Sequence, residues 1–229
     1  MTTFVLIHGA YQGGWIWKPT AERLQAKGHL VLTPTLDGCA ERKGALRAGI
    51  DTESHAAEIA ELLFYQDLKG VVLAGTSTGG MVMARAAELA RERVARVVFA
   101  DALALLDGEA LPDIVKRPTA VNTELGTGPS RQDFETRLFA DLDPKVRAWA
   151  LERCTPHPIA AMQAPVRLER FWDQAWNASV IWCKRSSNPP VAHQRRAAER
   201  LKARWHELDT GHYPMLSEPA ALAELIAEG

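Results

Sequence analysis

The feature that most constrains this chain is the sequence GTSTG at residues 75–79, which joins a strand-like run to a helix-like run. Residues 71–74 (VVLA) are apolar and rich in Val, as is typical of a buried strand. Residues 81–91 are rich in Ala and Met and contain no Pro, which favours a helix. Glycines two positions before and after Ser77 remove Cβ clashes at a sharp turn. The G-x-S-x-G spacing therefore predicts a nucleophilic serine beside the amides of a helix N-terminus.

Apolar runs alternate with helical patterns along most of the 229 residues, which is typical of a parallel sheet covered by helices. The length suffices for one α/β core. The predicted fold class is therefore α/β, with a mostly parallel sheet of about six strands. We expect strands at residues 4–7, 30–33, 71–74, 94–100, 179–183 and 204–208, and helices at 19–26, 51–65, 81–91, 191–203 and 219–227.

This alternation stops between residues 103 and 177, where helical pieces are broken by prolines and no strand-like run occurs. We interpret this stretch as a helical cap over the carboxyl edge of the sheet, where ligands bind in open α/β folds. The predicted organisation is a core of residues 1–102 and 178–229 with a helical cap insertion of residues 103–177.

Composition argues against several other classes of protein. The chain has 27 Lys and Arg residues against 28 Asp and Glu residues and no basic stripe, so we expect no nucleic-acid or membrane partner. No apolar stretch approaches the roughly 20 residues that span a bilayer. Cys39, Cys154 and Cys183 form no C-x-x-C motif, which argues against a metal site or a disulfide framework. Because a strand follows Met1 almost at once, we expect no signal peptide and a cytoplasmic protein, of open oligomeric state.

A serine nucleophile needs a base that takes its proton, and seven histidines compete for this role. His212 is the candidate because it follows the last predicted strand and therefore lies at the same sheet edge as Ser77. The neighbouring Gly211 and Pro214 favour a fixed turn. We expect the other histidines to be structural, with His29, His193 and His206 on the surfaces of helices or strands.

The first predicted strand ends in HGAYQGGW at residues 8–15, a glycine-rich stretch that lets the backbone approach a substrate oxygen. We expect the oxyanion hole to consist of the backbone amides of Ala10 and Thr78, the latter directly after the nucleophile. His8 is expected to brace this loop, and Tyr11 to reach the substrate. The alternative is a simple glycine-rich turn. Without G-x-G-x-x-G or a Walker lysine, the stretch does not favour a nucleotide cofactor, and we expect no cofactor.

Four stretches in this order resemble the α/β-hydrolase branch that contains plant methylesterases, hydroxynitrile lyases and small bacterial esterases. They are VLIHGAYQGGWIW (5–17), GTSTGG (75–80), VVFADALALLDGE (97–109) and TGHYPMLSEP (210–219). The resemblance runs nearly end to end. It implies a sheet without the first antiparallel strands of that fold and a helical cap inserted after the strand that follows the elbow.

Two positions separate this chain from the lyases of that branch. The lyases typically have threonine where this chain has Gly9, and lysine after the catalytic histidine where it has Tyr213. The resemblance therefore favours ester hydrolysis over cyanohydrin cleavage.

The third member of the catalytic triad is not at its usual place. Relatives have an aspartate after the strand that follows the cap, and the matching position here is Ser186, which cannot carry a negative charge. Asp101 is the candidate acid, because it ends the strand beside the elbow strand and some branches of the fold take their acid there. Asp209 and Asp173 are weaker candidates.

These observations predict a cofactor-independent serine hydrolase, a carboxylesterase or lactonase, acting on a small, rather apolar ester through an acyl-enzyme on Ser77. Ser77, His212 and Asp101 are the predicted catalytic residues. The cap aromatics Trp149 and Trp172 are predicted to contact substrate, or else to form the core of the cap itself. The alternatives are a lyase or another cofactor-free reaction with His212 as base, and a non-catalytic ligand-binding protein.

Overall fold

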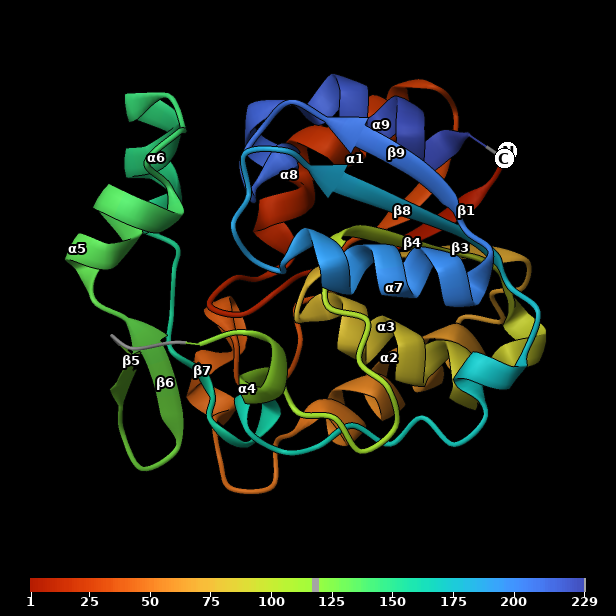
Figure 1. The fold of residues 1–229 in the computed structure, drawn as a ribbon, viewed down its shortest axis with the longest axis horizontal. Helices are drawn as coiled ribbons and strands as arrows, with labels where there is room; N and C mark the ends of the chain where they lie inside the picture. Colours follow the sequence, from red (N-terminus) through yellow and green to blue (C-terminus); the bar gives the residue numbers. More distant parts are fainter. Residues whose placement is uncertain (117–119, 229) are drawn as a thin grey trace.

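The structure is a computed structural model that describes residues 1–116 and 120–228. Its centre is a sheet in which neighbouring strands all run parallel (Figure 1). Within the described residues this sheet has six strands, which confirms the predicted α/β class. They are β1 (Thr3–Ile7), β2 (Leu30–Leu32), β3 (Val71–Ser77), β4 (Val94–Ala102), β8 (Asn177–Cys183) and β9 (Arg204–Leu208), and their order is β2-β1-β3-β4-β8-β9.

Helices cover both faces of the sheet (Figure 1). One face carries α1 (Lys18–Ala26), α8 (Pro214–Ser217) and α9 (Pro219–Ala227), and the other carries α2 (Thr52–Tyr65), α3 (Gly79–Leu89) and α7 (Val191–Leu201). Short helical turns η1 (Gly14–Trp17), η2 (Ala40–Ala45) and η3 (Arg91–Arg93) lie in the connections. None of the helices in the described part of the chain has both the length and the apolar character needed to cross a membrane.

The sequence explains where these elements begin and why they pack. The α2 helix starts with a capping box, in which the Asp51 carboxylate accepts from the Ser54 amide at 2.8 Å and the Ser54 hydroxyl accepts from the Asp51 amide at 2.9 Å. The β3 strand is covered by helices on both faces, so its residues 71–76 are all buried. Because β3 lies between β1 and β4, the loops after these strands flank the end of β3.

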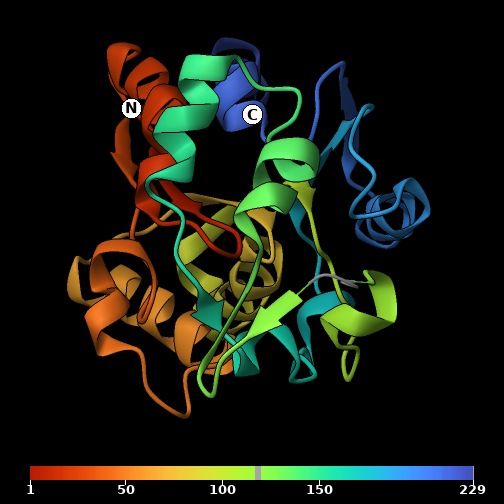
Figure 2. The same ribbon diagram turned by 90° about the vertical axis from the view of Figure 1, so that its left-hand side faces the viewer.

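Much of the segment between β4 and β8 lies beyond the carboxyl ends of the strands, and Figure 2 looks onto this part. The last part of the segment runs back along the helices and packs against α3. The expectation that it is only helical is wrong, because it also contains an antiparallel sheet of three short strands among the described residues. Together these short strands are rich in Gly and Pro, and they lack alternating apolar residues. The sequence pattern therefore does not predict them. Residues 117–119 of the predicted cap lie outside the described residues. The strands are β5 (Ala120–Asn122), β6 (Gly126–Pro129) and β7 (His157–Pro158), and the helices are α4 (Leu111–Ile114), α5 (Arg131–Asp133), η4 (Phe134–Leu138), α6 (Pro144–Leu151), η5 (Ala160–Met162) and η6 (Phe171–Asp173).

Candidate active site

Ser77 is the last residue of β3, and its backbone has a φ of +51°, in the left-handed region that non-glycine residues rarely adopt. Helix α3 begins two residues later. A Cβ atom at Gly75 would lie 2.6 Å from the Gly79 carbonyl oxygen, and one at Gly79 would lie 2.5 Å from the Ile7 carbonyl oxygen. Both glycines are therefore required by close backbone contacts at this turn, and the strained serine is held at the tip between strand and helix.

Asp101 lies beside this turn because of an irregularity in β4. The pairing of β3 with β4 runs from Thr76 opposite Ala100 to Ser77 opposite Ala102, so Asp101 is an extra, bulged residue. Its φ of +46° is also in the left-handed region, and it is completely buried. A bulge of this kind redirects one side chain without ending the strand.

The bulged carboxylate is held by three donors. Its Oδ2 lies 2.6 Å from Nδ1 of His212, in the loop between β9 and α8. Its Oδ1 accepts from the Gln194 side-chain nitrogen at 2.8 Å and from the Cys183 amide at 3.3 Å. Because an ionised carboxylate only accepts hydrogen bonds, Nδ1 of His212 carries the proton. The other ring nitrogen, Nε2, is then the basic one, which is the tautomer that a general base needs.

Neither the residue at the usual acid position nor the two weaker candidate acids make hydrogen-bond contact with His212 in the described part of the chain. The Ser186 hydroxyl donates to the Asn188 carbonyl oxygen at 3.0 Å. The Asp209 side chain is 76% exposed and lies 3.6 Å from the Arg185 guanidinium, and Asp173 lies in η6 of the cap. In the part of the chain that the structure describes, Asp101 is the carboxylate in hydrogen-bond contact with His212.

Sequence reasoning missed Gln194, which lies in the first turn of α7 and is buried. Its side-chain nitrogen donates to Asp101 and also to the Pro189 carbonyl oxygen at 3.1 Å. Both partners are acceptors, so the amide must present its NH₂ group to them. No local pattern identifies this residue, since its partner is 93 positions away in the chain.

A second contact at the histidine loop comes from the cap. The Asp141 Oδ2 atom accepts from the Gly211 amide at 3.0 Å, directly before His212. The cap and the loop that carries His212 are thus joined by a carboxylate–amide hydrogen bond between residues 70 positions apart. This contact also lay beyond any sequence pattern.

His8 braces the loop that carries the Ala10 amide. Its Nε2 accepts from the Leu36 amide at 3.0 Å, so the proton of the neutral ring is on Nδ1, which donates to the Gly9 carbonyl at 2.8 Å. The Gly9 carbonyl and the Ala10 N–H belong to the same peptide plane, so His8 orients this amide. Burial lowers the pKa of His8 to about 4, which keeps the ring neutral.

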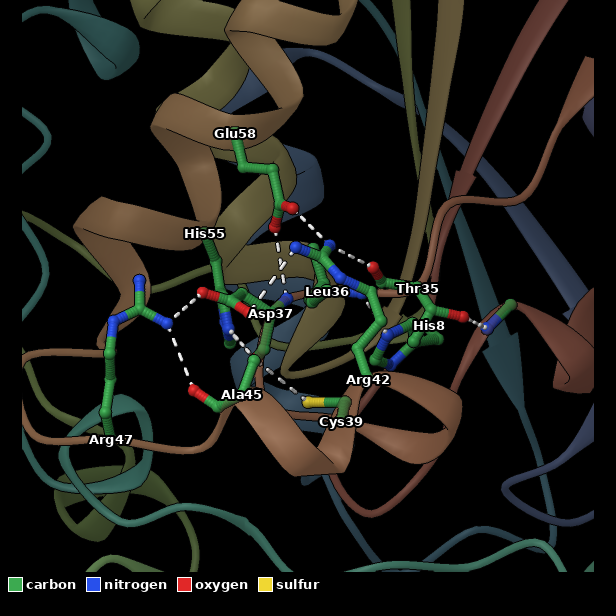
Figure 3. A network of polar contacts seen from close by, with 11 residues as sticks. His8, Thr35, Leu36, Asp37, Cys39, Arg42, Ala45, Arg47, His55 and Glu58 are labelled. Carbon is green, nitrogen blue, oxygen red and sulfur yellow. Dashed lines mark hydrogen bonds and ion pairs between the residues drawn. The ribbon is translucent and has the colours of Figure 1, made fainter.

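Leu36, whose amide donates to His8, lies in a segment that a network of polar contacts holds in place (Figure 3). The Asp37 amide donates to Glu58 at 3.1 Å, and the Asp37 carboxylate pairs with Arg47 at 2.6 Å. Arg42 pairs with Glu58 and donates to the Thr35 carbonyl at 2.7 Å. The segment that contains the Leu36 amide is therefore anchored on both sides.

These groups surround one cavity of about 370 Å³. Five predicted site residues line it together: Ser77, His212, Ala10, Thr78 and Tyr11. Asp101 lies behind His212 and is completely buried. The remaining lining is contributed by cap residues such as Met162 and by the loops after β4 and β8.

Trp149 and Trp172, which were predicted to contact substrate, do not line the cavity that the described residues form. Trp149 packs edge-on against Trp15, with ring centroids 5.2 Å apart. Trp172 donates from its indole nitrogen to the Leu105 carbonyl at 3.0 Å. The Trp149 ring therefore attaches the cap to the core through Trp15, and the Trp172 ring does so by packing under the Arg200 guanidinium of α7, 5.6 Å from the ring centroid.

The expectation that His193 lies on a helix surface is also wrong. His193 is buried on the inner face of α7, and its Nε2 accepts from the Ala104 amide at 2.9 Å. Burial lowers its pKa to about 4. His29 and His206 are partly buried. Arg and Ala dominate the sequence of α7, so its amphipathic pattern does not indicate which polar residues face inward.

Comparisons with known proteins find similarity to hydrolases and esterases. A family model described as "Alpha/beta hydrolase family" matches residues 4–225. A "Carbendazim hydrolyzing esterase" from Nocardioides sp. (strain SG-4G) is 30% identical over 99% of this chain and 99% of its own. Methylesterase 3 of Arabidopsis thaliana is 28% identical over 98% of this chain and 94% of its own. The solved structure of an extracellular alpha/beta-hydrolase from a Paenibacillus species, described as sharing homology with Tobacco Salicylic Acid Binding Protein 2, has a TM-score of 0.85 and 22% identity over 100% of this chain and 98% of its own.

Proposed function

Because the chain belongs to the alpha/beta hydrolase family, we propose that it hydrolyses carboxylic esters through an acyl-enzyme intermediate on Ser77. One observation carries this proposal. The His212 ring bonds through Nδ1 to the buried Asp101 carboxylate at 2.6 Å and lines the same cavity as Ser77. A serine, a histidine with a free Nε2 and a buried acid are the parts that nucleophilic acyl transfer needs.

The first half of the reaction forms the acyl-enzyme. Ser77 Oγ attacks the ester carbonyl carbon while its proton passes to Nε2 of His212. Asp101 stabilises the imidazolium that forms, and the amides of Ala10 and Thr78 donate to the developing oxyanion. The tetrahedral intermediate then collapses, the C–O bond of the ester breaks, and the alcohol leaves with the proton from His212.

The second half releases the acid. Water loses a proton to His212 as it attacks the acyl carbon, and the same amides receive the second oxyanion. Collapse returns the proton to Ser77 Oγ and frees the carboxylic acid, so ester and water give acid and alcohol. The Ser77 hydroxyl has no hydrogen-bond partner within residues 1–116 and 120–228, and catalytic hydrogen bonds of this kind often tighten only in the substrate complex.

The substrate is a small ester with an apolar portion. The cavity of about 370 Å³ is of the size that holds a small molecule. Apolar side chains line much of it, among them Leu103, Leu138 and Met162. The similarity to a carbendazim hydrolyzing esterase and to a methylesterase supports a small ester rather than a lipid or a polymer.

The lyase alternative is disfavoured by two positions. A Cβ atom at Gly9 would lie 2.7 Å from the Ser77 Cβ, so the threonine of the lyases has no space here. Tyr213, at the position of the lyase lysine, is buried against Phe139 with ring centroids 4.6 Å apart. Burial raises the pKa of the Tyr213 phenol, and the same burial would penalise a lysine ammonium.

The test is covalent labelling of the nucleophile. The intact chain is treated with a neutral organophosphonate, and the adduct is assigned by mass spectrometry of its peptides. We expect one adduct on Ser77, and none on the Ser77→Ala variant, which also loses para-nitrophenyl acetate hydrolysis. Ester turnover by Ser77→Ala at the rate of the unaltered chain would exclude the acyl-enzyme mechanism.

A further inference from the structure

The charged side chains that line the cavity are mostly cationic. Among the described residues, Lys116, Arg137 and Arg185 line it, against a single carboxylate, Asp141. The whole chain has nearly balanced charge, with 27 basic and 28 acidic residues, so this excess is local to the cavity. Charges of one sign in a cleft with low-dielectric walls focus the field and attract ligands of the opposite sign.

The carboxylates that pair with the two arginines do not line the cavity. Arg137 Nε lies 3.7 Å from Asp133, and Arg185 Nε lies 3.6 Å from Asp209, distances beyond those of good hydrogen bonds. Neither Asp133 nor Asp209 lines the cavity. Arg185 also donates from one terminal nitrogen to the Asp209 carbonyl oxygen at 2.8 Å. Both arginine side chains are more than half exposed, and a guanidinium has five N–H donors, so each retains donors for a ligand.

Two further observations concern the charged groups on the lining. Lys116 has no hydrogen-bond or ion-pair partner among the residues that the structure describes. The one carboxylate on the lining, Asp141, already accepts from the Gly211 amide at 3.0 Å. The catalytic Asp101 is completely buried behind His212 and does not line the cavity.

We propose that the preferred substrates of this site are esters that carry a second, free carboxylate outside the reacting ester group. This inference rests on the proposed ester hydrolysis and specifies its substrate class. The apolar body of such a molecule lies against side chains such as Leu111 and Val115, while its carboxylate pairs with Arg137, Arg185 or Lys116. Arginine forks match a carboxylate with two parallel hydrogen bonds, which fixes the orientation of the ester relative to Ser77.

The experiment compares pairs of esters of similar size in which one member carries a free carboxylate and the other is neutral. The first pair is mono-para-nitrophenyl glutarate and para-nitrophenyl pentanoate, which have acyl chains of equal length. The second pair is para-acetoxybenzoate and para-acetoxybenzamide, in which the charge lies on the leaving group. We expect about tenfold higher kcat/KM for the anionic member of at least one pair, because each exposed ion pair contributes about two- to fivefold. The preference should fall as NaCl rises from about 0.02 M to about 0.5 M.

Single substitutions test which cations cause the preference for anionic esters. Arg137→Gln, Arg185→Gln and Lys116→Gln are each expected to lower the ratio of anionic to neutral kcat/KM, and the double arginine variant to remove most of it. Arg131→Gln is the matched control. It neutralises an arginine of the same cap segment that pairs with Glu135 and does not line the cavity, so the ratio should stay unchanged.

Equal kcat/KM for both members of both pairs, or a preference insensitive to salt and to these variants, would overturn the inference and leave ester hydrolysis standing. The neutral esters and the phosphonate adduct on Ser77 test ester hydrolysis by themselves. Absence of both turnover and adduct would overturn the proposed function, and the substrate class with it.

Discussion

The Asp101 carboxylate and the His212 ring lie 2.6 Å apart although 111 residues of chain separate them. Asp101 comes from the central strand β4, and His212 from the loop after the edge strand β9. The contact is possible because a bulge in β4 turns Asp101 out of the regular pairing at the carboxyl edge of the sheet. The usual acid position, Ser186, lies in the loop after the strand between them.

The first prediction concerns this pair. Asp101→Asn should lower kcat by about 10³- to 10⁴-fold, because the amide keeps the shape but no longer stabilises the imidazolium or its tautomer. Steady-state hydrolysis of a neutral para-nitrophenyl ester measures this loss. Asp173→Asn, in η6 of the cap, is the control and should change kcat by less than about twofold. Near-normal turnover by Asp101→Asn would mean that another group serves as the acid.

The second prediction assigns a positioning role to Gln194. Gln194→Met has similar length but no donor, so one oxygen of Asp101 keeps only the 3.3 Å bond from Cys183. A hydrogen bond to a charged group contributes about 1.5–3 kcal/mol, so kcat should fall about 10- to 100-fold. KM should hardly change, because Gln194 does not line the cavity.

A merely structural role for Gln194 would lower the midpoint of thermal unfolding without lowering kcat of the protein that remains folded. Gln194→Glu is the informative companion. It keeps the size of the side chain but places a second buried carboxyl against Asp101, and we expect it to be less active than Gln194→Met. The reverse order of activities would contradict the positioning role.

The third prediction concerns the space at Gly9. A Cβ atom there would lie 2.7 Å from the Ser77 Cβ and 3.1 Å from the Thr76 carbonyl oxygen, so Gly9→Ala must displace Ser77 or the loop. We expect a loss of kcat/KM of about 100-fold, as follows from a displacement of reacting groups by about 1 Å. Phosphonate labelling of Ser77 should slow in parallel. Gly44→Ala is the control, since a Cβ at Gly44 meets no atom within 4 Å.

The fourth prediction links pH to stability through His8. Burial lowers its pKa from 6.5 to about 4, so between these values the unfolded chain binds a proton that the folded chain does not. The free energy of unfolding should therefore fall as pH drops from 6.5 towards 4, with His8 contributing up to about 1.4 kcal/mol per pH unit.

Urea unfolding across this pH range measures the effect. His193 and other buried histidines add to the slope, so the comparison that isolates His8 is with His8→Gln, whose slope should be shallower. Parallel pH profiles for the two proteins would show that His8 does not titrate in this way. Above pH 6.5 the two profiles should run parallel, since His8 is neutral in both states.

Local sequence patterns are sufficient to predict those parts of this protein that depend on residues close together in the chain. The elbow requires glycines within two positions of Ser77, and the spacing of residues 75–79 reveals them directly. Buried parallel strands need continuous apolar runs, so residues 71–74 and the other strands are readable from the sequence. The loop with His212 follows the last such run, and the chain order alone brings it to the edge that carries Ser77.

The tertiary structure decided what depends on contacts between distant segments. Asp101, Asp209 and Asp173 are equal by residue type, and only the bulge in β4 brings one of them to His212. Gln194, 93 positions from Asp101, has no local signature at all. The cap strands and the places of Trp149 and Trp172 follow from packing across the insertion, where short, proline-rich pieces have no period of their own. A pattern within a few residues cannot encode such contacts, because their free energy arises between surfaces that meet only after the chain has folded.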